Sequence, residues 1–176
     1  MNYIFLDNGF EEIEAITTID LLRRANIALT TVSVTGKEWV LGAHNIAVKA
    51  DTLFADADFA DAELLILPGG QPGATNLANH TGLKKVLQAA MDANRPVAAI
   101  CAAPMVLGGH GLIEGRRVTT YPGCEPGLGN AICTGALVEQ DGNLITGKGP
   151  AAAVEFANAI IRLLRSEELQ KDVCSK

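Results

Sequence analysis

Short, almost wholly apolar segments, each followed at once by turn-forming or small residues, constrain this chain more than any other feature. Residues 3–6, 63–67 and 97–100 show no alternation of polar and apolar side chains. This is the pattern of strands that are buried on both faces of a parallel sheet, since a strand with one face in water would alternate. The loops that follow these strands should therefore meet at one edge of the sheet, where ligands of such folds collect.

Amphipathic helices are expected between the strands. Segment 11–24 repeats apolar residues at helical spacing, with glutamates in its first turn and arginines in its last, an order that favours the helix dipole. Segments 83–94 and 151–165 are also expected to be helical. This alternation predicts βαβ units and an α/β fold with a mostly parallel sheet and helices on both faces. Further strands are expected at 29–34, 117–121 and 144–146, with a hairpin at 39–50.

Composition restricts the possible partners. The 176 residues are expected to form a single domain, 1–176, with a charged tail at 166–176. The formal net charge of −6, without a block of Lys or Arg, argues against a specific nucleic-acid ligand. No apolar run reaches membrane-span length and no secretory signal pattern opens the sequence, so a cytoplasmic protein is expected. The four cysteines lack metal-site spacing, which predicts free thiols and no bound metal.

Cys101 stands where a strand should end and a helix, from about Ala102 to Leu107, should begin. At that junction unpaired backbone N–H groups and the helix dipole favour a thiolate, which predicts an acidic, nucleophilic cysteine. The alternative is a buried structural cysteine, because free cysteine is among the most buried residue types.

Two further loops should reach the same edge of the sheet. Glycine at position 70 lets a backbone N–H approach a ligand, and together with the N–H of Ala102 it could stabilise an oxyanion, although Gly69-Gly70 is also compatible with a simple tight turn. Glu11, Glu12 and Glu14 begin the first helix, where carboxylates usually face solvent. One of them could turn toward Cys101 and stay protonated through burial, but the pattern alone does not say which.

These segments resemble the ThiJ/PfpI superfamily, most closely the branch of the parkinsonism-associated protein deglycase and its bacterial relatives. The resemblance runs from about Tyr3 to Leu164. The motifs that carry it, in order, are Gly9-Phe10-Glu11-Glu12-Ile13-Glu14-Ala15, Leu67-Pro68-Gly69-Gly70, Ala98-Ala99-Ile100-Cys101-Ala102-Ala103-Pro104 and Gly149-Pro150.

The resemblance implies a flavodoxin-like three-layer sandwich, a homodimer and a reactive cysteine on a strained strand-to-helix turn. By position, Cys101 is the reactive and oxidisable thiol, Glu14 the protonated carboxyl that hydrogen-bonds it, and Gly70 and Ala102 the backbone donors. The implied activity needs no cofactor: it converts glyoxal or methylglyoxal to hydroxy acids, or removes their early adducts from proteins and nucleotides.

The chain departs from the family pattern at two places. Tyr121 stands in the Thr-Thr-x-Pro loop where a histidine is found in the best-known family site, so the expected partner of Cys101 is a carboxylic acid rather than an imidazole. His44 aligns with an arginine that lines an anion site near the dimer interface, whereas Arg24 matches that arginine's partner. Gly69, Tyr121, Arg24 and His44 are therefore candidate pocket residues.

The resemblance and these residues together imply three possible functions. The first is a glyoxalase or deglycase acting on a small aldehyde or on glycated side chains through Cys101 and Glu14. The second is a redox-responsive stress-protection or chaperone protein, whose Cys101 is oxidised to a sulfinate and whose Cys124 is either a resolving thiol or merely exposed. The third, an intracellular cysteine peptidase, is disfavoured because Ala102 follows Cys101 where that branch has a histidine.

Overall fold

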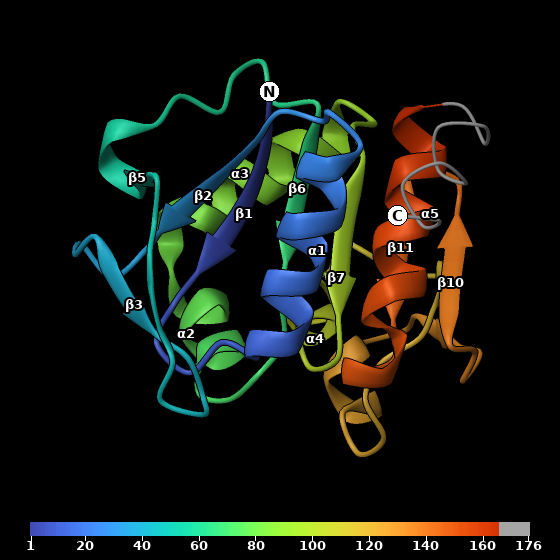
Figure 1. Ribbon diagram of the computed structural model, residues 1–176. Helices are drawn as coiled ribbons and strands as arrows, with labels where there is room; N and C mark the ends of the chain where they lie inside the picture. Colours follow the sequence, from blue (N-terminus) through green and yellow to red (C-terminus); the bar gives the residue numbers. More distant parts are fainter. Residues whose placement is uncertain (166–176) are drawn as a thin grey trace.

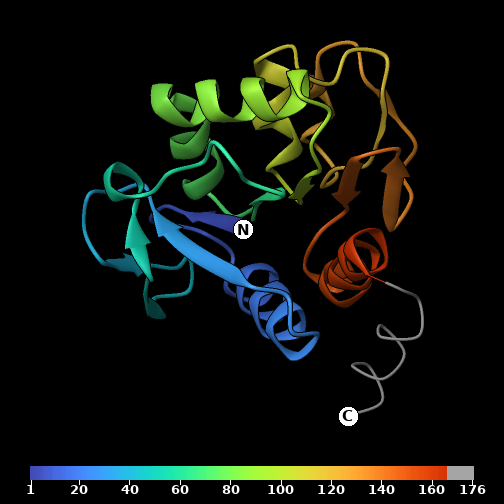
Figure 2. The same cartoon turned by 90° about the horizontal axis from the view of Figure 1, so that it is seen from above.

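A central sheet divides the molecule into three layers (Figures 1 and 2). The computed structural model describes residues 1–165. Successive side chains of a strand point to opposite faces, and the fully buried strands use both faces. Ile4 and Ile66 join one hydrophobic core, whereas Phe5 and Leu65, their chain neighbours, join the other. The absence of alternation in the sequence is therefore explained by burial on both sides.

The main sheet has seven strands and is parallel except at one edge. Its five inner strands follow the chain in the spatial order 2-1-3-4-5, the flavodoxin-like arrangement. The expected α/β sandwich is thus confirmed. In spatial order the strands are β10 (Val138–Asp141), β11 (Leu144–Gly147), β7 (Val97–Ile100), β6 (Leu64–Leu67), β1 (Asn2–Leu6), β2 (Leu29–Ser33) and β5 (Thr52–Leu53).

Helices cover both faces of this sheet. The first and last helices pack against each other on one face, and the other three cover the opposite face (Figure 2). The helices are α1 (Glu12–Arg24), α2 (Gly73–Asn79), α3 (Thr81–Asp92), α4 (Pro104–Gly109) and α5 (Ala153–Leu164). Short 3₁₀ turns occupy Phe54–Asp56, Glu125–Leu128 and Pro150–Ala152. Within residues 1–165, none of the helices combines the length and apolar character that a membrane crossing requires.

Several expected boundaries change in the structure. The hairpin expected at 39–50 forms as β3 (Trp39–Leu41) and β4 (Ala47–Lys49). The strand expected at 117–121 was wrong in extent: only β8 (Arg117–Val118) forms, and it pairs with β9 (Ile132–Cys133) outside the main sheet. Residues 119–121 instead turn toward Cys101, as described below.

We expect Phe156→Ala to reveal how strongly α5 anchors this layer. Phe156 is fully buried between α5 and the sheet, so its truncation should lower the free energy of unfolding by about 3–5 kcal/mol. Val154→Ala, at an exposed position of the same helix, should change it by less than about 0.5 kcal/mol. Urea unfolding of both variants measures the difference, and equal effects would contradict the assigned packing.

Candidate active site

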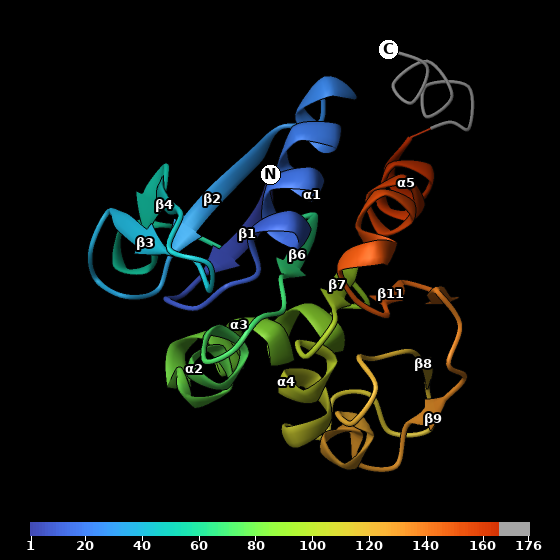
Figure 3. The ribbon, with the colours of Figure 1, turned by 60° about the horizontal axis from the view of Figure 1, so that its bottom comes forward.

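Cys101 adopts a left-handed backbone conformation directly after β7. Its φ is 65°, a region that non-glycine residues rarely occupy. Hydrogen bonds hold both of its peptide groups: its N–H donates to the Gly147 carbonyl (2.8 Å), and its carbonyl accepts from Thr120 Oγ1 (2.7 Å) and the Tyr121 N–H (2.9 Å). The turn carries the chain from the carboxyl end of β7 toward α4, at the edge that Figure 3 brings forward.

Two backbone N–H groups lie near the sulfur of Cys101 and favour its thiolate form. They belong to Ala102, the next residue, and to Gly70, in the loop after β6. Gly70 has a φ of +91°, and a side chain there would overlap the backbone of Phe10 and Glu11. The close approach of this loop to the start of α1 therefore requires glycine, and it brings the two expected donors to one atom.

Glu14 is the glutamate that reaches Cys101. It is fully buried, and its Oε2 accepts the Gly69 N–H at 2.8 Å. Its Oε1 is buried without a well-formed hydrogen bond to any described residue, while the carboxyl lies within side-chain hydrogen-bonding reach of the thiol. Gly69 separates the two side chains: a Cβ there would lie 2.5 Å from Cys101 Cβ and 2.6 Å from Glu14 Oε2.

Burial governs the ionisation of this pair. It raises the pKa of Glu14 to about 7, although the neighbouring Cys101 thiol and the Gly69 N–H favour the carboxylate, and the charge of Glu11 adds to the rise. Burial, followed by the Glu14 carboxylate, also raises the pKa of the Cys101 thiol, although the N–H groups of Ala102 and Gly70 act in the opposite direction. The expectation of an acidic thiol considered the helix N-terminus alone, and the desolvation of the sulfur opposes it.

Glu11 and Glu12 were expected to face solvent, and that was wrong. Glu12 is buried beneath the β3–β4 loop, where its Oε1 accepts the His44 N–H (2.7 Å) and its Oε2 lies 2.9 Å from His44 Nδ1. Glu11 is likewise buried, and its Oε2 lies 3.6 Å from the same ring nitrogen. The first turn of α1 thus directs three carboxylates into the protein.

The candidate pocket residues lie at different places. Tyr121 is attached to the site through its backbone, but its side chain is half exposed and its ring lies beside Gly149. His44 contacts Glu11 and Glu12 rather than Cys101. Arg24 ends α1, ten residues or roughly 15 Å along the helix from Glu14, and pairs with Asp20 at 2.7 Å. The structure therefore does not bring Arg24 to the thiol.

Within residues 1–165, no hydrogen bond or ion pair joins Cys101 to another cysteine or to a histidine. His80 caps α3, accepting the Leu83 N–H, and His110 ends α4. No histidine of the chain has a hydrogen bond or ion pair with Cys101 in the described structure, which leaves Glu14 as its ionisable partner. Burial raises the pKa of the half-buried Cys124 thiol. Cys174 lies outside the described residues.

Sequence reasoning missed the support that residues 119–121 give to the site. Thr119 donates its N–H to Thr146 Oγ1 (2.9 Å), and Thr120 donates its hydroxyl to the Cys101 carbonyl. Both threonines are buried. The adjacent threonines before Tyr121-Pro122 were the available signal, since buried hydroxyl groups require hydrogen-bond partners.

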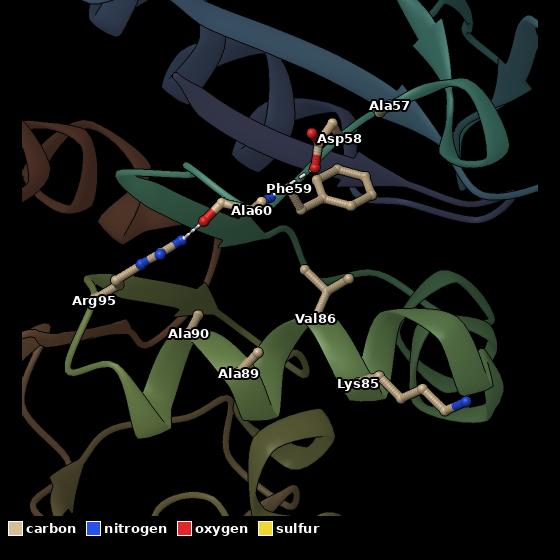
Figure 4. Close-up of a pocket in the computed structure, with 9 residues that line it drawn as sticks. All are labelled: Ala57, Asp58, Phe59, Ala60, Lys85, Val86, Ala89, Ala90 and Arg95. Carbon is tan, nitrogen blue, oxygen red and sulfur yellow. Dashed lines mark hydrogen bonds between the residues drawn. The ribbon is translucent and has the colours of Figure 1, made fainter.

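A separate hollow lies at the opposite edge of the sheet (Figure 4). It has a volume of about 380 Å³ between the chain segment before β6 and helix α3. Phe59, Val86 and Ala89 give it apolar walls, and Arg95, hydrogen-bonded to the Ala60 carbonyl, lies at one end. No cysteine among the described residues lines this hollow, so the candidate cysteine chemistry stays at the Cys101 edge.

Comparison with known proteins gives consistent matches. Residues 2–163 match the model of the DJ-1/PfpI family. The Parkinson disease protein 7 homolog of Danio rerio is 35% identical, covering 97% of this chain and 92% of that protein. A deglycase of Pyrococcus horikoshii is 28% identical, covering 94% of this chain and all of that protein.

Solved structures agree with this match. The structure of oxidized Toxoplasma gondii DJ-1 superposes with a TM-score of 0.94 at 31% identity, covering 98% of this chain and 95% of that one. Drosophila melanogaster DJ-1beta gives a TM-score of 0.93 at 33% identity, covering 99% and 97%.

We expect Glu14 to make stability depend on pH. A carboxyl whose pKa is higher in the folded state, here about 7 against the usual 4.5, is neutral in both states below pH 4.5. As pH rises from 4.5 to 7 the unfolded state loses its proton first, so stability should fall by up to roughly 3 kcal/mol and then level off. Urea unfolding of the wild type relative to Glu14→Gln, across this range, measures the fall. A difference independent of pH would contradict it.

Proposed function

The chain belongs to the DJ-1/PfpI family, and on that premise we propose that it is a cofactor-independent, cysteine-dependent glyoxalase or deglycase. Its proposed substrates are methylglyoxal, glyoxal or their early adducts on proteins and nucleotides. The observation that carries the proposal is the left-handed Cys101, whose sulfur lies beside the buried carboxyl of Glu14, with the Gly70 and Ala102 N–H groups acting to favour its thiolate. The similar deglycase of Pyrococcus horikoshii supports it.

The first step joins the Cys101 sulfur to the aldehyde carbon. Glu14, as a carboxylate, takes the thiol proton as the bond forms, which offsets the raised pKa of the thiol. The aldehyde oxygen becomes an oxyanion, and the N–H groups of Gly70 and Ala102 provide the donors for it. Proton transfer from Glu14 to this oxygen then gives a neutral hemithioacetal and restores the carboxylate.

The second step moves hydrogen within the adduct. Glu14 removes the proton from the former aldehyde carbon and returns it to the neighbouring carbonyl carbon, while the hydroxyl proton of the adduct passes to the neighbouring oxygen. The aldehyde carbon is oxidised to a thioester as its neighbour is reduced to an alcohol, so no external oxidant is needed. Water then cleaves the thioester, releasing lactate from methylglyoxal or glycolate from glyoxal and regenerating the thiol.

The burial of Cys101 restricts what can react. Its exposed fraction is only 9%, so a substrate must present a small, unhindered carbonyl group. Free dicarbonyls meet this condition. A glycated side chain meets it only if the dicarbonyl adduct itself reaches the edge of the sheet.

Turnover should depend on both members of the pair. We expect Cys101→Ala to abolish lactate formation from methylglyoxal, and Glu14→Gln to reduce kcat by roughly 100-fold or more, the usual contribution of a general acid-base group. Cys124→Ala is the matched control and should retain wild-type rates. Proton NMR of the product measures the rate. Full turnover by Cys101→Ala would exclude the proposed chemistry.

A redox-responsive role of the same cysteine is the second candidate. The similar Toxoplasma gondii structure is of an oxidized DJ-1 protein, which favours it. In this role peroxide oxidises the Cys101 thiol to a sulfinate, and the thiol does not act in a catalytic cycle. Mass spectrometry after mild peroxide treatment, compared with the turnover assay, separates the two: sulfinate at Cys101 without turnover supports the sensor.

We further propose a homodimer in the cytoplasm. Ile13 and Ile16 form an exposed apolar pair, one helical turn apart, on α1. The cysteines within residues 1–165 are free, as a reducing compartment favours.

Substitution of the apolar pair tests the dimer. Ile16→Glu should produce a monomer, because the free energy needed to remove a carboxylate from water at an apolar interface exceeds the free energy gained by association. Ile132→Glu, at an exposed apolar position on β9, is the control. Light scattering during gel filtration measures the mass. A dimer that survives Ile16→Glu would place the interface elsewhere.

A further inference from the structure

Two carboxylates and an imidazole converge where α1 meets the β3–β4 loop. Glu11 and Glu12 come from the start of the helix, and His44 comes from the loop above them. One ligand atom from each lies within 4.8 Å of the others. None of these side chains takes part in the chemistry proposed for Cys101.

The separations suit a small divalent cation. His44 Nδ1 lies 2.9 Å from Glu12 Oε2 and 3.6 Å from Glu11 Oε2. Nitrogen and oxygen ligands of a tetrahedral zinc ion lie about 2.0–2.2 Å from the metal, which places neighbouring ligands about 3.4 Å apart. The two observed separations fall on either side of that value, so small side-chain movements suffice for coordination.

The Glu11 carboxylate has room for a closer positively charged partner. The Glu11 side chain is 12% exposed, and its carboxylate points toward His44. Its oxygens accept no hydrogen bond from any described residue. Its ion-pair contact is with the exposed His44 ring, whose Nδ1 lies 3.6 Å from Glu11 Oε2. A carboxylate with so little access to water is stabilised by a nearby positive charge, and a bound cation would supply a closer one than the imidazole at 3.6 Å.

Glu12 is held in place by the protein backbone. Its Oε1 accepts the N–H groups of His44 (2.7 Å) and Ile46 (3.4 Å), which leaves Oε2 directed at the imidazole. Gly42 lies so close to this carboxyl that a side chain there would overlap it. Hydrogen bonds to a ligating carboxylate are a regular feature of metal sites, since they fix its orientation.

We propose that Glu11, Glu12 and His44 form a binding site for one divalent metal ion that accepts nitrogen and oxygen ligands, of which Zn²⁺ is the best match. The ion replaces the proton between His44 Nδ1 and Glu12 Oε2 and joins the β3–β4 loop to the start of α1. Three protein ligands leave a fourth position for water. Spacing in the sequence did not reveal the site, because more than thirty residues separate His44 from the glutamates.

Metal titration of the full-length protein tests the proposal. Protein stripped with a chelator is titrated with Zn²⁺ by calorimetry and with Co²⁺ by visible absorption. We expect one ion per chain, a cobalt spectrum without a thiolate charge-transfer band, and a higher Tm with Zn²⁺. His44→Ala and Glu11→Gln should each weaken binding by about tenfold or more and remove the rise in Tm. His44 is exposed, so its truncation leaves the core intact, and far-UV circular dichroism verifies this.

Matched variants distinguish this site from other ligands in the chain. His110→Gln and Glu63→Gln should bind the ion as the wild type does, and so should Cys101→Ala. The proposal is overturned if the wild type binds no ion, if His44→Ala and Glu11→Gln bind it unchanged, or if Cys101→Ala abolishes binding. These outcomes do not depend on whether the protein turns over methylglyoxal, so the metal site and the proposed activity can fail separately.

Discussion

Cys101 leaves the sheet with a positive φ because hydrogen bonds from three directions fix its two peptide groups. Gly147 accepts its N–H from the neighbouring strand, while Thr120 and Tyr121 donate to its carbonyl from a loop beyond α4. Such a conformation costs of order 1–3 kcal/mol and persists only where the surroundings specify it. The position of the sulfur relative to Glu14 and Gly70 depends on this turn, so the candidate site is a product of the whole carboxyl edge of the sheet.

The placement of three carboxylates in one turn of α1 shows how the same sequence pattern can have different physical outcomes. Glu14 is buried beside a thiol and holds its proton into the neutral range, whereas Glu12 accepts backbone N–H groups from the β3–β4 loop. The Glu11 carboxylate accepts no hydrogen bond from a described residue and has only a 3.6 Å contact with His44. A helix N-terminus favours negative charge in each case, but the loops that cover the helix decide what each carboxylate does.

Much of the fold could be predicted from the sequence because burial on both faces of β1, β6 and β7 leaves a plain apolar pattern. The meeting of Cys101 with the 69–70 loop also followed from strand order, since parallel strands end at one edge. The choice of Glu14 over Glu11 and Glu12 required the resemblance to a family, because helical spacing does not say which way a first turn faces. Tertiary contacts determine the short helix α2 and the extent of β8. Desolvation raises the pKa of Cys101. The local sequence pattern contains neither kind of information.

The two edges of the main sheet direct how the molecule can associate. At one edge β5 is only two residues long, and at the other β10 carries Glu139 and Asp141, which pair with Arg117 and Arg116 at 3.4 and 3.2 Å. Short or charged edge strands are poor templates for the addition of a further strand. The sheet is therefore closed to continuous edge-to-edge growth, which protects a chain this rich in apolar strands from aggregation and leaves the helical faces as the surfaces available for ordered assembly.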